Sequence, residues 1–183
     1  MHLNAGTIYR REMLVPFSNA IDRDLSRLVS NGVLEKVAVG LYYKPMLSCF
    51  GALPPSDNDL VRTFLRDDYF LLYSWNQYNV LGLGLTQLYN QLVVYNRKRH
   101  GVFSLGNKSF DFRRPARGFP DKLTPEFLLV DLVNNMSELA EDENLVKSSI
   151  KSNCHRFNSK KIMAFANKYG KIATRKFFEE IIH

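Results

Sequence analysis

Cysteine is scarce in this sequence, and long apolar runs are absent from it. The two cysteines among 183 residues are Cys49 and Cys154, and neither belongs to a Cys-x-x-Cys pair, which argues against a disulfide framework, a zinc site or thiol exchange. No stretch approaches the roughly 18 apolar residues that span a membrane, and residues 1–4 lack the charged and apolar regions of a secretory signal. We therefore expect a cytoplasmic protein with reduced cysteines and no membrane partner.

A strong compositional bias is also missing. Hydrophobic residues make up 45% and charged residues 23% of the chain, an ordinary globular mixture that excludes disorder, collagen-like repeats and coiled coil. Lys and Arg outnumber Asp and Glu by 25 to 18, and this net charge of +7 favours an anionic partner. Residues 96–122 carry 8 basic and 2 acidic side chains, residues 123–143 carry none and 6, and residues 144–183 carry 9 and 2. Much of the positive charge therefore lies outside the first segment of the chain.

Residues 10–30 follow a helix-turn-helix pattern. Residues 10–14 predict a short helix, and residues 15–18 predict the turn that leads to the next helix, with Ser18 as its N-cap. Over residues 19–30, apolar side chains recur at helical spacing on one face, and Gly32 supplies the positive φ that commonly ends a helix. The apolar residues are Ile21, Leu25, Leu28 and Val29, and the opposite face presents Asn19, Arg23, Ser26 and Ser30, with Arg27 at its border.

A wing and a domain boundary follow this pattern. Residues 33–43 are rich in β-formers and predict two strands that fold back at or near Gly40. Proline, glycine and polar residues then cluster between positions 45 and 59, as they do in linkers. The sequence therefore predicts a winged helix-turn-helix domain at residues 1–47 and a second domain at residues 58–183.

The second domain mixes strands and helices, which places the protein in the α+β class. Apolar residues at helical spacing begin at Leu60 and predict a helix capped by Asp57 or Asp59. A second such helix is predicted after Thr124, with Thr124 as its N-cap and Pro125 as its first residue. Strands are expected at residues 69–73 and 91–97 and in a hairpin of residues 102–105 and 109–112, and further helices at residues 75–83, 125–140, 145–152, 159–169 and 173–182, with Gly170 as a stop.

Two segments carry a resemblance to a known family. The first is Gly40-Leu41-Tyr42-Tyr43-Lys44-Pro45 with the following Gly51-Ala52-Leu53-Pro54-Pro55-Ser56. The second is Asn79-Val80-Leu81-Gly82-Leu83-Gly84-Leu85-Thr86-Gln87, similar to an Asn-Leu-Leu-Gly-Leu-Ser-x-Gln signature. In this order behind a helix-turn-helix, they resemble the AbiEi antitoxin family of bacterial type IV, abortive-infection toxin–antitoxin systems, from about Gly6 to Arg114.

This resemblance implies a transcriptional regulator without catalytic activity. It implies that the first domain binds double-stranded DNA at the operator of its own promoter. It also implies that the second domain is needed to neutralise a nucleotidyltransferase toxin encoded beside it, directly or indirectly.

The residues themselves are compatible with DNA binding and with one alternative. An exposed second helix can enter the major groove, where Arg and Asn pair with base edges, and a wing can touch the phosphate backbone. However, Asp22 and Asp24 beside the reading face would repel phosphates, and Val39 stands before Gly40. These features leave open a non-catalytic protein-interaction adaptor that keeps the winged fold. The candidate DNA-binding residues are Ser18, Asn19, Arg23, Ser26, Arg27, Lys36, Tyr42 and Lys44.

A second basic surface is predicted around the hairpin. Its residues lie at opposite ends of the flanking strands, so folding could bring them together as an anion-binding strip. The acidic stretch at residues 138–143 is an alternative, internal partner for them. The residues of this surface are Arg97, Lys98, Arg99, Arg113 and Arg114, next to His100.

No pattern indicates a catalytic residue, a metal site or a cofactor. Asp57 and Asp59 precede a helical segment and are explained by capping and by the helix dipole rather than by magnesium. Gly82-Leu83-Gly84 lacks the third glycine and the Lys-Ser/Thr of nucleotide sites, and the four histidines are dispersed. The aromatic residues between positions 69 and 78 are interleaved with aliphatic ones and predict core rather than a base-stacking platform.

Overall fold

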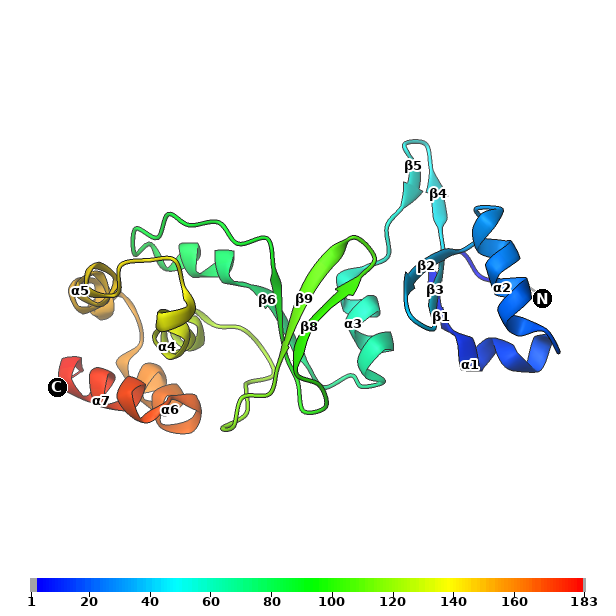
Figure 1. Ribbon diagram of the computed structural model, residues 1–183. Coiled ribbons are helices and arrows are strands. Elements are labelled where there is room, and N and C mark those ends of the chain that lie inside the picture. The colour runs from blue at the N-terminus through cyan, green and yellow to red at the C-terminus, as the bar shows by residue number, and fades with distance from the viewer. Residues whose placement is uncertain (1–2, 183) are drawn as a thin grey trace. The chain divides into compact units, whose positions relative to one another are not determined.

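The computed structural model describes residues 3–182 and contains both helices and strands, which confirms the α+β class (Figure 1). The chain divides into two compact units. The first runs to Phe70 and includes Gly101–Asp111, and the second comprises Leu71–His100 and the chain from Phe112 onward. This division differs from the predicted boundary, since residues 58–70 and 101–111, which were predicted in the second domain, lie in the first unit together with residues 48–57. Residues 1, 2 and 183, at the outer ends of the two predicted domains, lie outside the described residues.

The first unit contains a three-stranded antiparallel sheet with the strand order β1–β3–β2 and a two-stranded sheet, β4–β5. The predicted reversal at Gly40 is confirmed, with φ at 72°, whereas strand β1 was not predicted. The elements are β1 (Thr7–Arg10), α1 (Arg11–Leu14), η1 (Val15–Phe17), α2 (Ile21–Ser30), β2 (Glu35–Ala38), β3 (Leu41–Lys44), β4 (Met46–Ser48), β5 (Gly51–Leu53), α3 (Asp57–Leu65) and β8 (Gly101–Leu105).

The three-stranded sheet separates α2 from α3. Side chains alternate between the two faces along each strand, and the β1–β3 register pairs Tyr9 with Tyr42. Both tyrosines pack against the hydrophobic cluster that α2 helps to form. The next residue on β1, Arg10, turns to the other face, where its guanidinium donates to the carbonyls of Thr63 and Phe64 in α3 at 2.9 and 3.1 Å. These bonds satisfy carbonyls near the C-terminal end of α3, which an isolated helix would leave unpaired.

The predicted cap of α3 is wrong. Its N-cap is Ser56, not Asp57 or Asp59. Ser56 Oγ accepts a hydrogen bond from the backbone nitrogen of Asp59 at 3.1 Å and donates one to the Asp59 carboxylate at 2.6 Å. A serine hydroxyl can make both bonds at once, and so it secures the first turn in the manner of a capping box.

The second unit contributes to a four-stranded sheet with the order β6–β7–β9–β8 and holds the C-terminal helices. The predicted hairpin is confirmed, and Gly106 in its turn has φ at 61°. Thr124 caps α4 as predicted, accepting from Phe127 N at 3.2 Å, but α4 ends at Asn135. None of the helices within residues 3–182 is long and apolar enough to cross a membrane. Strand β9 (Lys108–Arg113) belongs to the first unit up to Asp111 and to the second from Phe112. The other elements of the second unit are β6 (Leu71–Ser74), η2 (Trp75–Leu81), β7 (Leu92–Tyr95), α4 (Pro125–Asn135), η3 (Met136–Glu138), α5 (Glu143–Asn153), η4 (Cys154–Arg156), α6 (Ser159–Tyr169) and α7 (Ile172–Ile181).

The core of the second unit contains a buried polar cluster. Asp131 on α4 is 2% exposed and accepts hydrogen bonds from the hydroxyls of Tyr73, Tyr78 and Tyr95 at 2.5, 2.7 and 2.7 Å. Asn135, one turn further along α4, donates to the Tyr95 hydroxyl at 2.9 Å. Burial raises the pKa of Asp131, and the hydrogen bonds from the three hydroxyls partly oppose this rise. Of the aromatic residues predicted as core between positions 69 and 78, Tyr73, Trp75 and Tyr78 are buried, whereas Tyr69 and Phe70 are half-buried. Tyr73 and Tyr78 are arranged around a carboxyl group.

Candidate nucleic-acid interface

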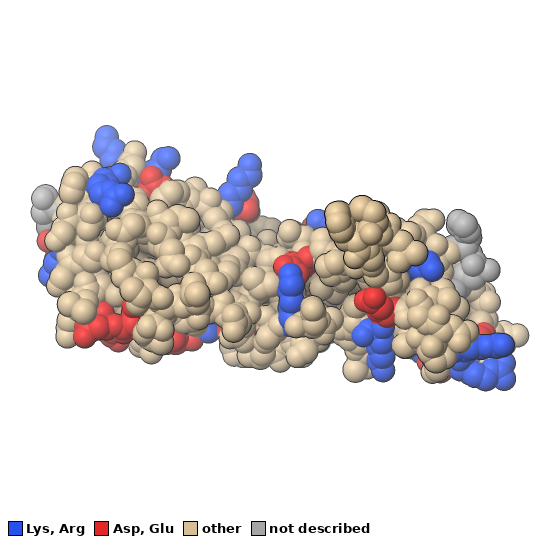
Figure 2. Space-filling view, turned by 90° about the horizontal axis from the view of Figure 1, so that it is seen from above, with Lys and Arg blue, Asp and Glu red and all other residues tan. Residues whose placement is uncertain are grey.

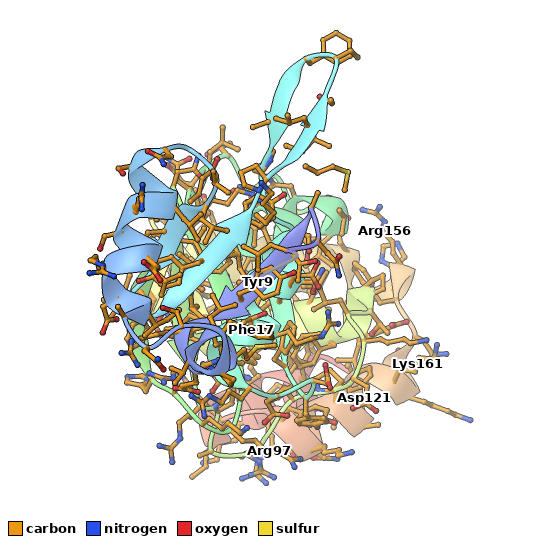
Figure 3. The ribbon with its side chains drawn as sticks, turned by 90° about the vertical axis from the view of Figure 1, so that its right-hand side faces the viewer. Tyr9, Phe17, Arg97, Asp121, Arg156 and Lys161 are labelled. Carbon is orange, nitrogen blue, oxygen red and sulfur yellow. The ribbon has the colours of Figure 1, made fainter. Side chains whose placement is uncertain are left out.

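Helix α2 divides into a buried face and an exposed face. Ile21 and Leu25 are 7% and 0% exposed and pack with Leu14 and Leu34. Side chains on the opposite face point outward from this helix (Figure 3). Arg23 has a side chain that is 82% exposed. The predicted reading residues that the structure leaves exposed are Asn19, just before the helix, and Arg23, Ser26 and Arg27 on it.

Ser18 is not the N-cap of α2, contrary to the sequence-based prediction. The N-cap position is occupied by Ala20, and Ser18 lies in the preceding turn. Its hydroxyl accepts from Ala20 N at 3.0 Å and donates to Asp24 Oδ2 at 2.5 Å. Ser26 likewise donates its hydroxyl proton to the carbonyl of Asp22 at 2.8 Å. Because both protons are used inside the protein, these serines can offer a ligand only an acceptor oxygen.

The acidic residues beside the exposed face of α2 are paired. The guanidinium of Arg11 donates two hydrogen bonds to the carboxylate of Asp22, both at 2.6 Å, and this pairing lowers the pKa of Asp22. Asp24 accepts from Ser18 and lies 3.9 Å from the Nε of Arg23. The two carboxylates are therefore weaker obstacles to a phosphate backbone than their number in the sequence suggests.

The candidate wing residues lie on the face of the sheet that carries α2. Lys36 pairs with Tyr42 across β2 and β3, and Lys44 follows Tyr42 by two residues, so the three side chains share a direction. Lys36 is exposed, whereas Lys44 is half-buried and Tyr42 packs against the α2 cluster. The outer edge of β2 is partly covered, since the carbonyl of Val37 accepts from Gly106 N at 2.6 Å. Both lysines thus point to the sheet face that carries α2, while Tyr42 has a packing role.

The two predicted basic segments of the second unit do meet. The backbone and side-chain nitrogens of Asn96 donate to the carbonyl of Arg113 at 2.9 and 3.2 Å, which joins the end of β7 to the end of β9. Asn96 Oδ1 accepts from the backbone nitrogens of Lys98 and Arg99 at 2.8 and 2.6 Å and so shapes the loop of residues 97–100. Sequence reasoning missed Asn96. The sequence feature that could have identified it is an asparagine directly after a strand, because such a side chain can form a hydrogen bond with the backbone two residues later.

Arg113 is not available to this basic surface. Its side chain is 19% exposed, lies 2.7 Å from Glu138 and stands over the ring of Trp75 at 4.9 Å. The acidic stretch therefore engages one member of the predicted set, as the alternative interpretation proposed. On the face seen in Figure 2, several Lys and Arg side chains also lie beside Asp or Glu. The remaining members are exposed: Arg97, whose place is marked in Figure 3, and Lys98, Arg99 and Arg114.

The acidic residues of the described chain do not gather into a metal centre. Within residues 3–182, no three His, Cys, Asp or Glu side chains form a group that could hold a metal ion. Asp57 forms an ion pair with Lys108 at 2.8 Å, and Asp59 is engaged with Ser56. No protein-family model matches this chain, and no curated protein matches it either. The functional argument therefore depends on the geometry of the exposed residues.

Proposed function

We propose that the first unit binds double-stranded DNA through α2 and that the protein is the antitoxin and autorepressor of a bacterial type IV toxin–antitoxin pair. The observation that carries the DNA-binding half is the exposed face of α2. It presents Arg23 and Arg27 to solvent above a fully buried Leu25, with Asp22 held by Arg11. The order of strand, short helices, α2 and hairpin, with the sheet order β1–β3–β2, supports a winged helix-turn-helix.

The dimensions and side chains of α2 match the major groove of DNA. The major groove is about 12 Å wide and admits one helix, and Arg23 and Arg27, one turn apart, point to the same side. Helix-turn-helix proteins read bases mainly with the N-terminal part of the second helix, where Asn19 and Arg23 lie. Lys36 and Lys44, on the same side of the sheet as α2, would contact the phosphates that flank this groove.

Arg23→Ala is expected to weaken operator binding by about 1–3 kcal/mol and to relax sequence preference, because Arg23 would lose a bidentate contact with a guanine edge. The measurement is a gel-shift titration on the intergenic sequence upstream of its own gene and on a random duplex, at about 50 and 200 mM salt. Lys160→Ala, on an exposed position of α6 in the second unit, is the matched control. Equal losses of affinity on both duplexes would contradict a base-reading role for Arg23 and leave it only a contact with phosphate.

One observation favours the adaptor alternative. Met13, Val15 and Phe17, in the short helices before α2, are 56%, 44% and 65% exposed. Apolar side chains in series suit a protein partner better than a phosphate backbone. The same gel-shift series separates the two functions, since an adaptor retards neither duplex at low salt.

The antitoxin half has its own test in the neighbouring gene. We expect the adjacent open reading frame to encode a nucleotidyltransferase whose expression alone arrests growth. Co-expression of this chain is expected to restore growth, and the α2 variant Arg23→Ala should still do so when both genes are placed under foreign promoters. Continued arrest with an abundant, folded chain contradicts the antitoxin role without affecting the DNA-binding proposal.

A further inference from the structure

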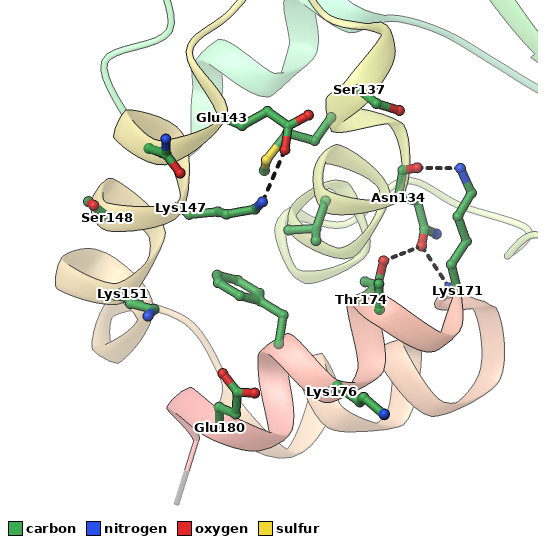
Figure 4. Close-up of a pocket in the computed structure, with 15 residues that line it drawn as sticks. Asn134, Ser137, Glu143, Lys147, Ser148, Lys151, Lys171, Thr174, Lys176 and Glu180 are labelled. Carbon is green, nitrogen blue, oxygen red and sulfur yellow. Dashed lines mark hydrogen bonds and ion pairs between the residues drawn. The ribbon is translucent and has the colours of Figure 1, made fainter.

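A groove of about 700 Å³ lies between α4, α5 and α7 in the second unit (Figure 4). Its lining combines apolar and charged side chains from three helices. The apolar part consists of Val133, Met136, Ala173 and Phe177. Lysines and glutamates of α5 and α7, with Lys171 just before α7, surround this apolar part, so that the groove has a hydrophobic floor and a charged rim.

The rim is predominantly positive. Four lysines but only two glutamates line the groove, and Lys147 neutralises Glu143 at 3.0 Å. Lys171 donates to the carbonyl of Asn134 at 2.5 Å, a bond that leaves its charge uncompensated. Lys151 and Lys176 form no ion pair with the residues that the structure describes. Positive charge around an apolar floor is complementary to a ligand that is apolar on one side and acidic at its flanks.

We propose that this groove binds an acidic amphipathic helix of a partner protein. An α-helix 10–12 Å across with a pitch of 5.4 Å occupies roughly 500 Å³ per turn, so the groove holds between one and two turns. Two apolar side chains spaced three or four residues apart would contact the half-buried Phe177 and Val133, as in other helix-in-groove complexes. Acidic side chains beside these anchors would meet Lys151 and Lys176.

The apolar floor distinguishes this partner from nucleic acid. Interfaces with nucleic acid are strongly polar because they meet sugar and phosphate, and Val133, Met136, Ala173 and Phe177 offer such a backbone nothing to bind. The groove belongs wholly to the second unit, whereas α2 belongs to the first. The inference therefore does not depend on the proposed DNA-binding function.

The test uses the full chain and a defined probe. The probe is a fluorescein-labelled helical peptide with leucines at i, i+3 and i+7 and glutamates beside them, and the control peptide carries lysine in place of glutamate. Fluorescence anisotropy is expected to give a dissociation constant of about 10 µM or tighter for the acidic peptide and at least about tenfold weaker binding for the basic one. Equal affinity for both peptides, or no binding of either at about 1 mM, overturns the proposal.

Charge-matched variants locate the binding. The double variant Lys151→Glu/Lys176→Glu is expected to weaken binding of the acidic peptide at least about tenfold. The control Lys160→Glu/Lys161→Glu, at exposed α6 positions outside the groove, is expected to leave this affinity unchanged. Ala173→Gln, which narrows the floor at an exposed α7 position, is expected to weaken binding without altering the rim charge. Circular dichroism verifies that each variant is folded. Equal losses in both charge variants, or displacement of the peptide by duplex DNA, refute a protein-docking groove.

Discussion

Asp131→Ala is expected to lower the free energy of unfolding by at least about 3 kcal/mol or to prevent the second unit from folding. In the native protein, one carboxyl group accepts hydrogen bonds from three tyrosine hydroxyls at 2.5–2.7 Å. Its removal leaves these hydroxyls buried without their acceptor, and each unsatisfied buried donor costs about 1–3 kcal/mol. The smaller side chain also leaves a cavity beside α4, whose neighbouring residues Val130 and Leu132 are both 0% exposed.

Two milder variants separate hydrogen bonding from charge. Asp131→Asn retains one acceptor oxygen in nearly the same shape, so it is expected to be less destabilising than alanine. Tyr73→Phe removes one donor and leaves the other two in place, for an expected loss of about 0.5–1.5 kcal/mol. Urea denaturation followed by circular dichroism measures all three variants. An Asp131→Ala protein within about 1 kcal/mol of wild type would show that the hydroxyls find other partners.

The sequence predicts the helices of the second unit well because their signals are local. Apolar spacing and a terminal glycine place α6 at its observed bounds, Ser159–Tyr169. The physical reason for Gly170 differs from the predicted one. Its φ is −69°, and not positive, but an added Cβ would lie 2.4 Å from the carbonyl oxygen of Ala166. Glycine is therefore required there by close backbone approach.

Strand β1 could not be predicted because its stability is not local. Its four residues, Thr7–Arg10, pair with β3 more than thirty positions later, and a four-residue segment without clean alternation carries little strand signal. The same is true of the boundary between the units. Proline and glycine mark residues 45–59 as irregular, but only tertiary contacts such as Arg10 to Thr63 attach α3 to the first unit.

At the candidate interface, the sequence likewise does not reveal which charged residues form ion pairs. Periodicity alone identifies the outward face of α2, because exposure follows from the position of the apolar stripe. Counting charges fails to show which of them are paired. Asp22 is held by Arg11, eleven residues earlier, and Arg113 by Glu138, twenty-five residues later. The first pairing strengthens the DNA-binding proposal, and the second removes a residue from the predicted second basic surface.

The position of Asp131 in the sequence is itself a signal of a buried polar group. This residue stands within the run Phe127-Leu128-Leu129-Val130-Asp131-Leu132, where an acidic side chain interrupts an otherwise apolar helix. A carboxyl group in such a place must be hydrogen-bonded or neutral, because burial penalises its charge. The observation predicts a buried polar partner set, although not which residues supply it, since Tyr73, Tyr78 and Tyr95 come from distant parts of the chain.

The same cluster leads to the second large expected effect, which is cooperative unfolding at alkaline pH. Burial, followed by the charge of Asp131, raises the pKa values of Tyr73, Tyr78 and Tyr95 well above their ordinary value. In the unfolded chain these phenols release their protons near pH 10, whereas the folded protein retains them. Above about pH 10 the unfolded state therefore binds fewer protons, so stability is fully present below this pH and falls progressively as the pH rises towards the raised pKa values of the folded state. Three such groups together lower stability by roughly 4 kcal/mol per pH unit.

The expected signature is a tyrosinate absorbance change that coincides with loss of the circular dichroism signal. Three of the nine tyrosines, Tyr73, Tyr78 and Tyr95, are expected to titrate only in that step. Tyr73→Phe should reduce the slope by about one third because it removes one of the three retained protons. A gradual titration of all nine tyrosines with the fold intact would mean that the cluster opens to solvent without global unfolding. The core of the second unit would then not be the closed network described around Asp131.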